Sequence, residues 1–215
     1  MLNCAGMLLA RRDLAMSDGF TEKAREAEAA AREAAEAAKE IDPRQEWETP
    51  PDLWAAINDE FHPTIDVCAT AANAKCFWYI GPQGEEEGRA ELWGIDGLQT
   101  EWLQGDNQAA WCNPGFSNIR PWLQRAYEQT QAYKGVAVVA GLVSPSTFWW
   151  RDWGCKANEI RLLSPRVQWI PAPGIEAEGG NSRENCLFVF RPGPRPPMPM
   201  IWTWEWRTPR RRGRA

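Results

Sequence analysis

The feature that most constrains the fold is a continuous run of small and β-branched apolar residues at positions 136–143. A strand without polar alternation buries both of its faces, which is typical of a central strand in a parallel sheet. The segment before it, residues 119–133, has apolar side chains at helical spacing. A helix followed directly by a buried strand is the repeating unit of α/β proteins. We therefore expect a sheet that is covered by helices.

Shorter segments on both sides continue this alternation. Thr49 is expected to be the N-cap of a helix that has proline in its first turn and ends near Phe61. One strand is expected to end at Cys112. Further strands are expected at residues 64–68, 75–80, 160–163, 167–170 and 186–190, and a short helix is expected at residues 146–153. The pattern predicts a three-layer α/β domain.

Three parts of the chain differ in composition. Residues 1–44 form a charged extension, in which residues 21–40 are expected to be a helix that is either solvated or used in oligomerisation. Residues 45–192 carry the alternation of strands and helices and are expected to be the folded domain. Residues 193–215 form a tail rich in Pro, Trp and Arg, in which residues 201–206 are either an edge strand or an aromatic arm.

Composition also excludes several classes of site. The six cysteines in 215 residues include no Cys-x-x-Cys pair, and His62 is the single histidine. A structural zinc site and a Ser-His-Asp triad are therefore not expected. No stretch of 18 apolar residues is present, so no membrane span is expected, and the first sixteen residues lack the layout of a signal peptide.

The net charge of −5 argues at first against a nucleic-acid partner, but the charge is distributed unevenly. Residues 44–106 hold thirteen acidic and three basic residues, whereas residues 107–192 hold nine basic and six acidic ones. The tail adds six arginines and one glutamate. The first half of the domain therefore suits a cationic ligand, and the second half and the tail suit phosphates, with binding expected to be weak and strongly salt-sensitive.

The most informative motif is Asn113-Pro114-Gly115-Phe116, which directly follows the strand expected to end at Cys112. The carboxyl edge of a parallel sheet is where α/β folds bind ligands. The side-chain carbonyl of Asn113 and the backbone carbonyl of Pro114 are two acceptors that suit a primary amine, and the Phe116 ring suits stacking on a flat heterocycle. The motif alone leaves two interpretations open, a site for the exocyclic amine of a base and an ordinary turn.

Several short motifs, in the same order, make residues 45–191 resemble the phage-type family of DNA N6-adenine methyltransferases, which depend on S-adenosylmethionine. Trp47-Glu48-Thr49-Pro50 resembles the family's Trp-x-Thr-Pro motif, and Asp66-Val67-Cys68-Ala69 resembles its Asp-x-Cys-Ala motif. Asp96-Gly97-Leu98, followed by Trp102, resembles its Asp-Gly-Leu…Trp motif. Trp111-Cys112-Asn113-Pro114-Gly115-Phe116 resembles its Trp-x-Asn-Pro-Pro-Tyr/Phe motif. Each motif is short, but their ordered conjunction is specific.

The resemblance implies a class I methyltransferase fold, which is a Rossmann-like, mostly parallel sheet of seven strands with one antiparallel strand. It implies methylation of the N6 amino group of adenine in DNA, in the cytoplasm of a bacterial or phage-infected cell and without a metal. The implied catalytic residues are Asn113, Pro114 and Phe116. The implied S-adenosylmethionine-binding residues are Trp47, Thr49, Pro50, Asp66, Cys68, Ala69, Asp96 and Asn113.

Two departures from the family pattern keep alternatives open. Gly115 stands where the family has its second proline, and residues 143–147 lack the arginine that often follows the long central strand. The same loop chemistry suits the N6 amine of adenine in RNA, the N4 amine of cytosine or a protein glutamine. The departures also suit a catalytically inactive module that only binds DNA.

Overall fold

The computed structural model describes residues 47–82, 90–171 and 182–207. The expected extension helix, the acidic residues 85–87 and the terminal arginines lie outside the described residues. The strands and helices, in chain order, are β1 (Trp47–Glu48), α2 (Pro51–Phe61), β2 (Ile65–Asp66), β3 (Trp78–Ile80), β4 (Glu91–Gly94), β5 (Ala109–Cys112), η2 (Phe116–Asn118), α3 (Arg120–Ala132), β6 (Val136–Leu142), α4 (Phe148–Asp152), η3 (Gly154–Lys156), β7 (Glu159–Ser164), β8 (Ile170–Pro171), β9 (Asn185–Phe190) and β10 (Met200–Glu205).

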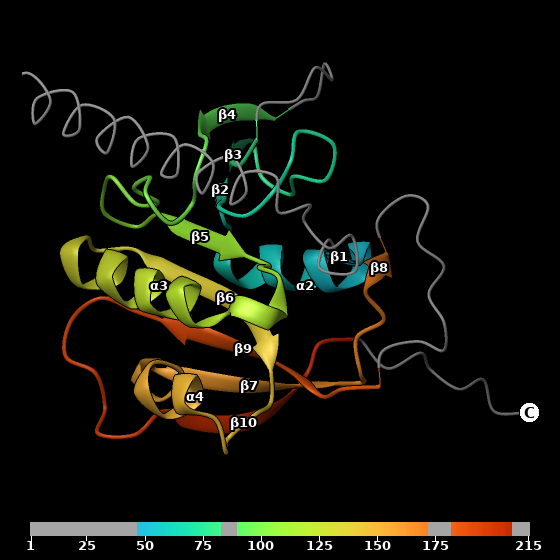
Figure 1. The fold of residues 1–215 in the computed structure, drawn as a ribbon, viewed down its shortest axis with the longest axis vertical. Helices are drawn as coiled ribbons and strands as arrows, with labels where there is room; N and C mark the ends of the chain where they lie inside the picture. Colours follow the sequence, from blue (N-terminus) through green and yellow to red (C-terminus); the bar gives the residue numbers. More distant parts are fainter. Residues whose placement is uncertain (1–46, 83–89, 172–181, 208–215) are drawn as a thin grey trace, which may run out of the picture. The chain divides into compact units, whose positions relative to one another are not determined.

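Eight of these strands form one sheet in the order β10-β7-β9-β6-β5-β2-β3-β4 (Figure 1). Strand β9 pairs antiparallel with β6 and β7, and every other neighbouring pair in this described sheet is parallel. The expected mostly parallel, Rossmann-like fold is confirmed, although the sheet has eight strands instead of seven. Compared with the seven expected strands, this sheet gains β4 and β10 and lacks a strand at residues 167–170. Strand β10 pairs along β7, so the edge-strand interpretation of residues 201–206 is confirmed.

Helices lie on both faces of the sheet, as the three-layer prediction requires (Figure 1). Successive residues of β6 point to opposite faces, because side chains alternate along a strand. Val139 packs in one buried cluster with Leu123 of α3 and Trp150 of α4. Val138 packs in a second cluster with Ile57 of α2. The buried residues 136–143 thus form a central strand that separates two cores.

Two local predictions are wrong, and one strand is not predicted. Thr49 is not the N-cap of α2, because Pro50 takes that position in an extended conformation (φ −60°, ψ 144°) and no side chain caps the helix. Strand β4, which pairs with β3, is not predicted from the sequence. Of residues 167–170, only Ile170 belongs to a strand, and β8 pairs with β1 in a separate two-stranded sheet. Within the described ranges, no helix is long and apolar enough to cross a membrane.

The strand order reverses between β2 and β5, and this reversal positions the site. From β2 the chain continues to β3 and β4 on one side, and it then returns to form β5 and β6 on the other side. Asp66 of β2 lies in register with Trp111 of β5, so the carboxyl ends of these two parallel strands are neighbours. Ligands of open α/β sheets bind in the crevice at such a switch point.

Candidate active site

The loop after β5 begins with Asn113, whose side-chain amide has a fixed orientation. Asn113 is half-buried, and its Nδ2 donates a hydrogen bond of 2.6 Å to the backbone carbonyl of Trp47 in β1. Only the NH₂ side of an amide can donate to a carbonyl. The Trp47 contact therefore leaves Asn113 Oδ1 as the acceptor of this side chain. Pro114, which follows it, is buried.

Gly115, which departs from the family pattern, does not adopt a conformation that needs glycine. Its φ of −57° and ψ of 122° lie in the region that proline occupies. The loop after Pro114 therefore follows a path that a second proline would also permit. Asn118 donates its backbone N–H to the Gly115 carbonyl at 3.3 Å, which closes the turn into η2.

Phe116 begins η2 and is half-buried. Its ring lies 5.7 Å from the ring of Trp169, at an interplanar angle of 73°. This edge-to-face geometry is a preferred arrangement of two aromatic rings. At least one face of the Phe116 ring is left uncovered by Trp169, because a near-perpendicular neighbour covers one side only.

Asp66 is a buried carboxyl group at the end of β2, with 3% of its surface exposed. Its oxygens accept the backbone N–H groups of Lys75 at 3.1 Å and of Cys68 at 3.5 Å. Burial raises the pKa of Asp66 to about 6, and the two N–H groups and the Lys75 charge lower it only in part. A carboxylate in this position is poorly compensated, so it favours a cationic ligand.

A glycine brings the turn at Asp96 close to the strand that holds Asp66. A Cβ atom on Gly97 would lie 2.2 Å from the carbonyl oxygen of Val67 and 2.7 Å from the Trp122 ring, so only glycine fits there. The Gly97 carbonyl also accepts the indole N–H of Trp102 at 2.6 Å. Asp96 itself is exposed, and one of its carboxylate oxygens accepts the Leu98 N–H at 2.8 Å.

The segment from Trp47 to Pro50 connects the two loops. Glu48 forms an ion pair with Lys75, whose backbone N–H binds Asp66, while the neighbouring Trp47 carbonyl binds Asn113. Thr49 and Pro50 are buried at the start of α2. One short segment of the chain is therefore tied to both β2 and β5 at their carboxyl ends.

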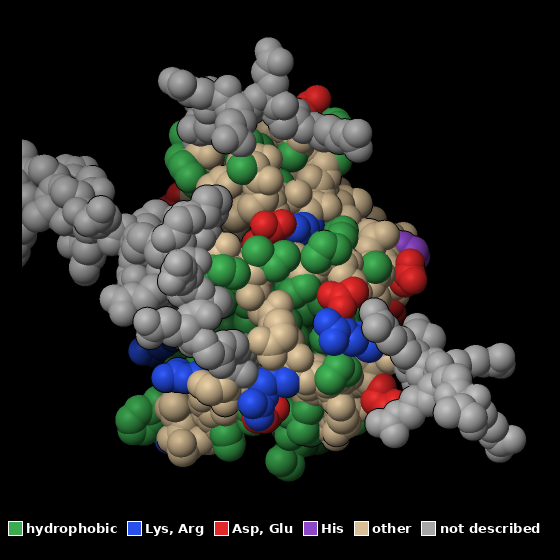
Figure 2. Space-filling model, turned by 90° about the vertical axis from the view of Figure 1, so that its right-hand side faces the viewer, with side chains coloured by type: hydrophobic (Ala, Val, Ile, Leu, Met, Phe, Trp, Pro, Cys, Tyr) green, Lys and Arg blue, Asp and Glu red, His purple; other side chains and the backbone are tan. Residues whose placement is uncertain are grey.

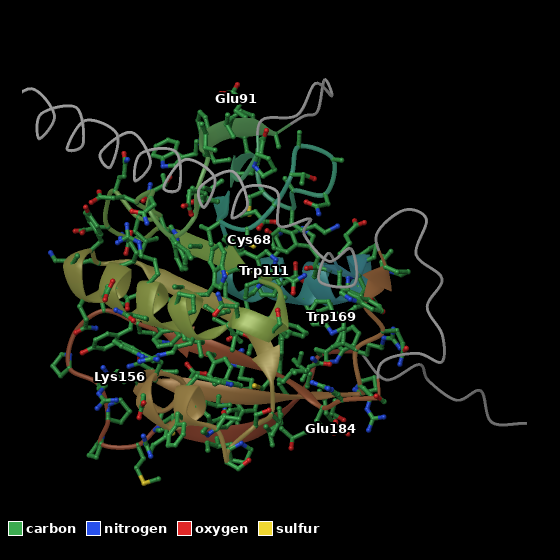
Figure 3. All side chains as sticks on the ribbon, viewed as in Figure 1. Cys68, Glu91, Trp111, Lys156, Trp169 and Glu184 are labelled. Carbon is green, nitrogen blue, oxygen red and sulfur yellow. The ribbon has the colours of Figure 1, made fainter. Side chains whose placement is uncertain are left out.

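The structure brings most of the predicted site residues to this edge. The two-residue strand β1 contacts the loop that contains Asn113, Pro114 and Phe116. The register of β2 and β5 places Asp66 beside that loop, and Cys68 and Ala69 follow Asp66 in the chain. Figure 3 shows Cys68 and Trp111 near the middle of the sheet and Trp169 beside β8. Figure 2, which views the molecule from the side of β1 and β8, shows acidic and basic side chains next to one another among hydrophobic ones.

Sequence reasoning missed Lys75 and Trp169 as members of the site. Lys75 is a single basic residue between Asp66 and the acidic residues that follow, and this isolation was the available signal. Trp169 belongs to the segment Arg166-Val167-Gln168-Trp169, which resembles a late feature of the family, but its contact with Phe116 joins segments far apart in the sequence and gave no local signal. Among the described residues, no group of three or more His, Cys, Asp or Glu side chains is placed to hold a metal ion.

Comparison with known proteins identifies a family and a relative. A family model described as DNA N-6-adenine-methyltransferase (Dam) matches residues 36–208. The chain is also 27% identical, over 151 residues, to the DNA N-6-adenine-methyltransferase of Haemophilus phage HP1 (strain HP1c1). That alignment covers 66% of this chain and 79% of the phage protein.

Proposed function

Because the chain belongs to the family of DNA N-6-adenine-methyltransferases and is a DNA adenine-N6 methyltransferase of the phage type, we propose that the loop at residues 113–116 holds the target adenine and that the loop after β2 holds S-adenosylmethionine. One observation carries this assignment. Asp66 and Trp111 lie in register at the switch point, so a cofactor beside β2 and a base beside β5 are neighbours.

On the adenine side, Asn113 and Pro114 act as hydrogen-bond acceptors. The N6 amine is a poor nucleophile, because its lone pair is delocalised into the ring. Asn113 Oδ1 and the Pro114 carbonyl accept its two N–H groups, which favours a pyramidal nitrogen with an exposed lone pair. The hydrogen bond from Asn113 Nδ2 to Trp47 supports this role, since it holds the amide in the orientation that presents Oδ1. Phe116 stacks on the base, which must leave the duplex to reach the loop.

On the cofactor side, Asp66 is the central residue. S-adenosylmethionine supplies a methyl group on a positively charged sulfur and also carries an ammonium group. The buried Asp66 carboxylate suits the ammonium, because its own partners are two backbone N–H groups and the Lys75 side chain is paired with Glu48. Trp47, Thr49, Pro50, Cys68 and Ala69 line the same end of the sheet. Asp96 offers an acceptor for the adenine amine of the cofactor.

The assignment is tested by following the methyl group. The full chain is incubated with methyl-labelled S-adenosylmethionine and, separately, with DNA from a methylation-deficient host, with RNA and with protein. We expect N6-methyladenine in DNA when the nucleosides are separated and weighed by mass spectrometry. Label in protein, in RNA or on cytosine N4, with no N6-methyladenine in DNA, would contradict the proposed substrate.

The roles of the loop are tested with a matched pair of variants. Asn113→Ala is expected to lower the methylation rate at least about 100-fold, as seen when one catalytic hydrogen-bonding group is removed elsewhere, while the dissociation constant of S-adenosylmethionine stays within about twofold. Asn118→Ala, which changes an exposed asparagine in the adjacent turn, is expected to retain activity. Full activity in Asn113→Ala would refute the mechanism.

A further inference from the structure

The two-stranded sheet of β1 and β8, together with the residue directly before β8, contacts both side chains that are proposed to handle the target base. From β1, the Trp47 carbonyl accepts the Asn113 amide at 2.6 Å. Next to β8, the Trp169 ring packs against the Phe116 ring at 5.7 Å. The two strands are joined by the pairs Trp47–Pro171 and Glu48–Ile170. Asn113 is thus held by β1, and Phe116 by the residue that directly precedes β8.

Trp169 has the properties of a support and none of a reacting group. It is 6% exposed, and it packs in the second hydrophobic cluster together with Trp111 of β5. Its indole nitrogen is buried and has no hydrogen-bond partner among the described residues. The observed contribution of this side chain is therefore the ring itself, which is large, buried and perpendicular to Phe116.

Phe116 needs such a support if it stacks on a base. It lies in a three-residue 3₁₀ turn and is only half-buried, so its backbone segment alone does little to orient its ring. A base stacks more favourably on a ring that is already held in the right plane, because less conformational entropy is then lost on binding. The Trp169 contact restricts the Phe116 ring from one side, and this near-perpendicular neighbour does not itself cover both of its faces.

We propose that Trp169 is a positioning residue for the methylation reaction, which fixes the plane of the Phe116 ring against which the target adenine stacks. This inference rests on the proposed function. It adds that the spacing between the amine-binding Asn113 and the stacking Phe116 is set from outside the loop, by β1 and the residue that directly precedes β8. Trp169 acts through Phe116, so its effect should depend on the presence of that ring.

The test measures kcat/KM for DNA in five forms of the full chain: unmodified, Trp169→Leu, Trp169→Phe, Phe116→Ala and the double variant Phe116→Ala/Trp169→Leu. Trp169→Phe keeps an aromatic ring and breaks no hydrogen bond, because the indole N–H has no described partner. Trp150→Leu is the matched control: Trp150 is also 6% exposed and also lies at 73° to a phenylalanine, Phe188, at 5.2 Å. If Trp169→Leu does not fold, Trp169→Met replaces it as the variant without an aromatic ring at this position.

We expect Trp169→Leu to lower kcat/KM about three- to tenfold, the range of one edge-to-face contact, without a change in the dissociation constant of S-adenosylmethionine. Trp169→Phe should recover most of the loss, and Trp169→Leu should change kcat/KM less than about twofold when Phe116 is already alanine. Trp150→Leu should stay close to the unmodified chain at temperatures where it is folded.

Four results would overturn the inference: no loss in Trp169→Leu, an equal loss in Trp169→Phe, an undiminished loss in the double variant, or the same loss in Trp150→Leu. These results are separate from a failure of the proposed function. If the unmodified chain forms no N6-methyladenine, the proposed function is wrong, whereas equal rates for the unmodified chain and Trp169→Leu count against the positioning role alone.

Discussion

In the proposed function the buried carboxyl group of Asp66 binds the ammonium of S-adenosylmethionine, so we expect cofactor affinity to depend on pH. Its pKa is raised to about 6, so with this pKa the group is almost fully ionised at pH 7.5 and about one-tenth ionised at pH 5. The ammonium of S-adenosylmethionine favours the ionised form. We therefore expect the affinity of the unmodified chain to fall about tenfold from pH 7.5 to pH 5, which corresponds to about 1.4 kcal/mol of binding free energy.

The measurement is isothermal titration of S-adenosylmethionine at several pH values, in buffers of different ionisation enthalpy. Near pH 6 the chain should release a fraction of a proton on binding, because binding converts the remaining neutral Asp66 to its charged form. Asp66→Asn should bind about 10- to 100-fold more weakly at pH 7.5, the range of a hydrogen bond to a charged group, and without this pH dependence. Asp106→Asn, which changes a carboxylate that is 62% exposed, is the control and should behave as the unmodified chain.

Two outcomes would refute the reasoning. A constant affinity of the unmodified chain between pH 5 and pH 7.5 would mean that Asp66 does not titrate with a raised pKa. An unchanged pH dependence in Asp66→Asn would mean that another group is responsible.

The same pKa shift has a predictable effect on the stability of the cofactor-free chain. Because the folded-state pKa of about 6 lies above the ordinary value of 3.8, the folded chain binds the Asp66 proton more tightly than the unfolded chain. The free energy of unfolding should therefore fall as the pH rises from about 4 to about 6, by up to about 3 kcal/mol. Urea unfolding at several pH values, compared with Asp66→Asn, isolates this contribution from those of the other carboxylates.

Three further variants test the local packing. Gly115→Pro should raise the free energy of unfolding by about 0.4–1 kcal/mol and retain activity, because the φ of −57° suits proline; an inactive but folded variant would contradict this loop geometry. Gly97→Ala should lower the free energy of unfolding by about 1–3 kcal/mol and weaken cofactor binding, because its Cβ would lie 2.2 Å from the Val67 carbonyl oxygen. An unchanged thermal stability of this variant would refute the close approach. Arg161→Met should lower the melting temperature, because it breaks the ion pairs of a buried guanidinium with Glu60 and Glu159, and it should leave cofactor affinity unchanged below that temperature. An unchanged melting temperature would show that these ion pairs contribute nothing to stability.

The parts of the fold that follow from local patterns are predicted well. Strand β6 and helix α3 appear within one residue of the ranges that periodicity indicates, because burial on two faces and amphipathic spacing are properties of the segment itself. The loop that begins at Asn113 also directly follows β5, as expected. These predictions need no knowledge of which segments pair.

The parts that depend on distant pairing are not predicted. Strand β4 has one apolar pair, Leu92-Trp93, and exists because β3 offers it an edge. Strands β1 and β8 have two residues each and are strands only because they pair with one another. The hydrogen bond from Asn113 to Trp47 and the contact of Trp169 with Phe116 depend on that pairing. The contacts that hold the Asn113 and Phe116 side chains therefore could not be predicted from the sequence.

The distribution of charge also shows the difference between what a segment reveals by itself and what depends on pairing within the fold. The basic second half of the chain was expected to contact phosphates, yet many of its cations are paired within the protein. Arg161 is bound by two glutamates and stacked against Trp202 and Trp204, which holds the edge strand β10 on the sheet. Arg191 and Arg207 pair with Glu159 and Asp52.

A cation that is already paired releases fewer counterions on binding DNA, so a count of charges overestimates the salt dependence. Arg120 differs, because it is exposed at the start of α3, six residues after Pro114, and makes no ion pair with another described residue. If the loop at residues 113–116 holds the target base, as proposed, we expect Arg120 to contact a phosphate beside that base. The sequence locates the positive charge, but only the pairing within the fold decides which part of that charge DNA can use.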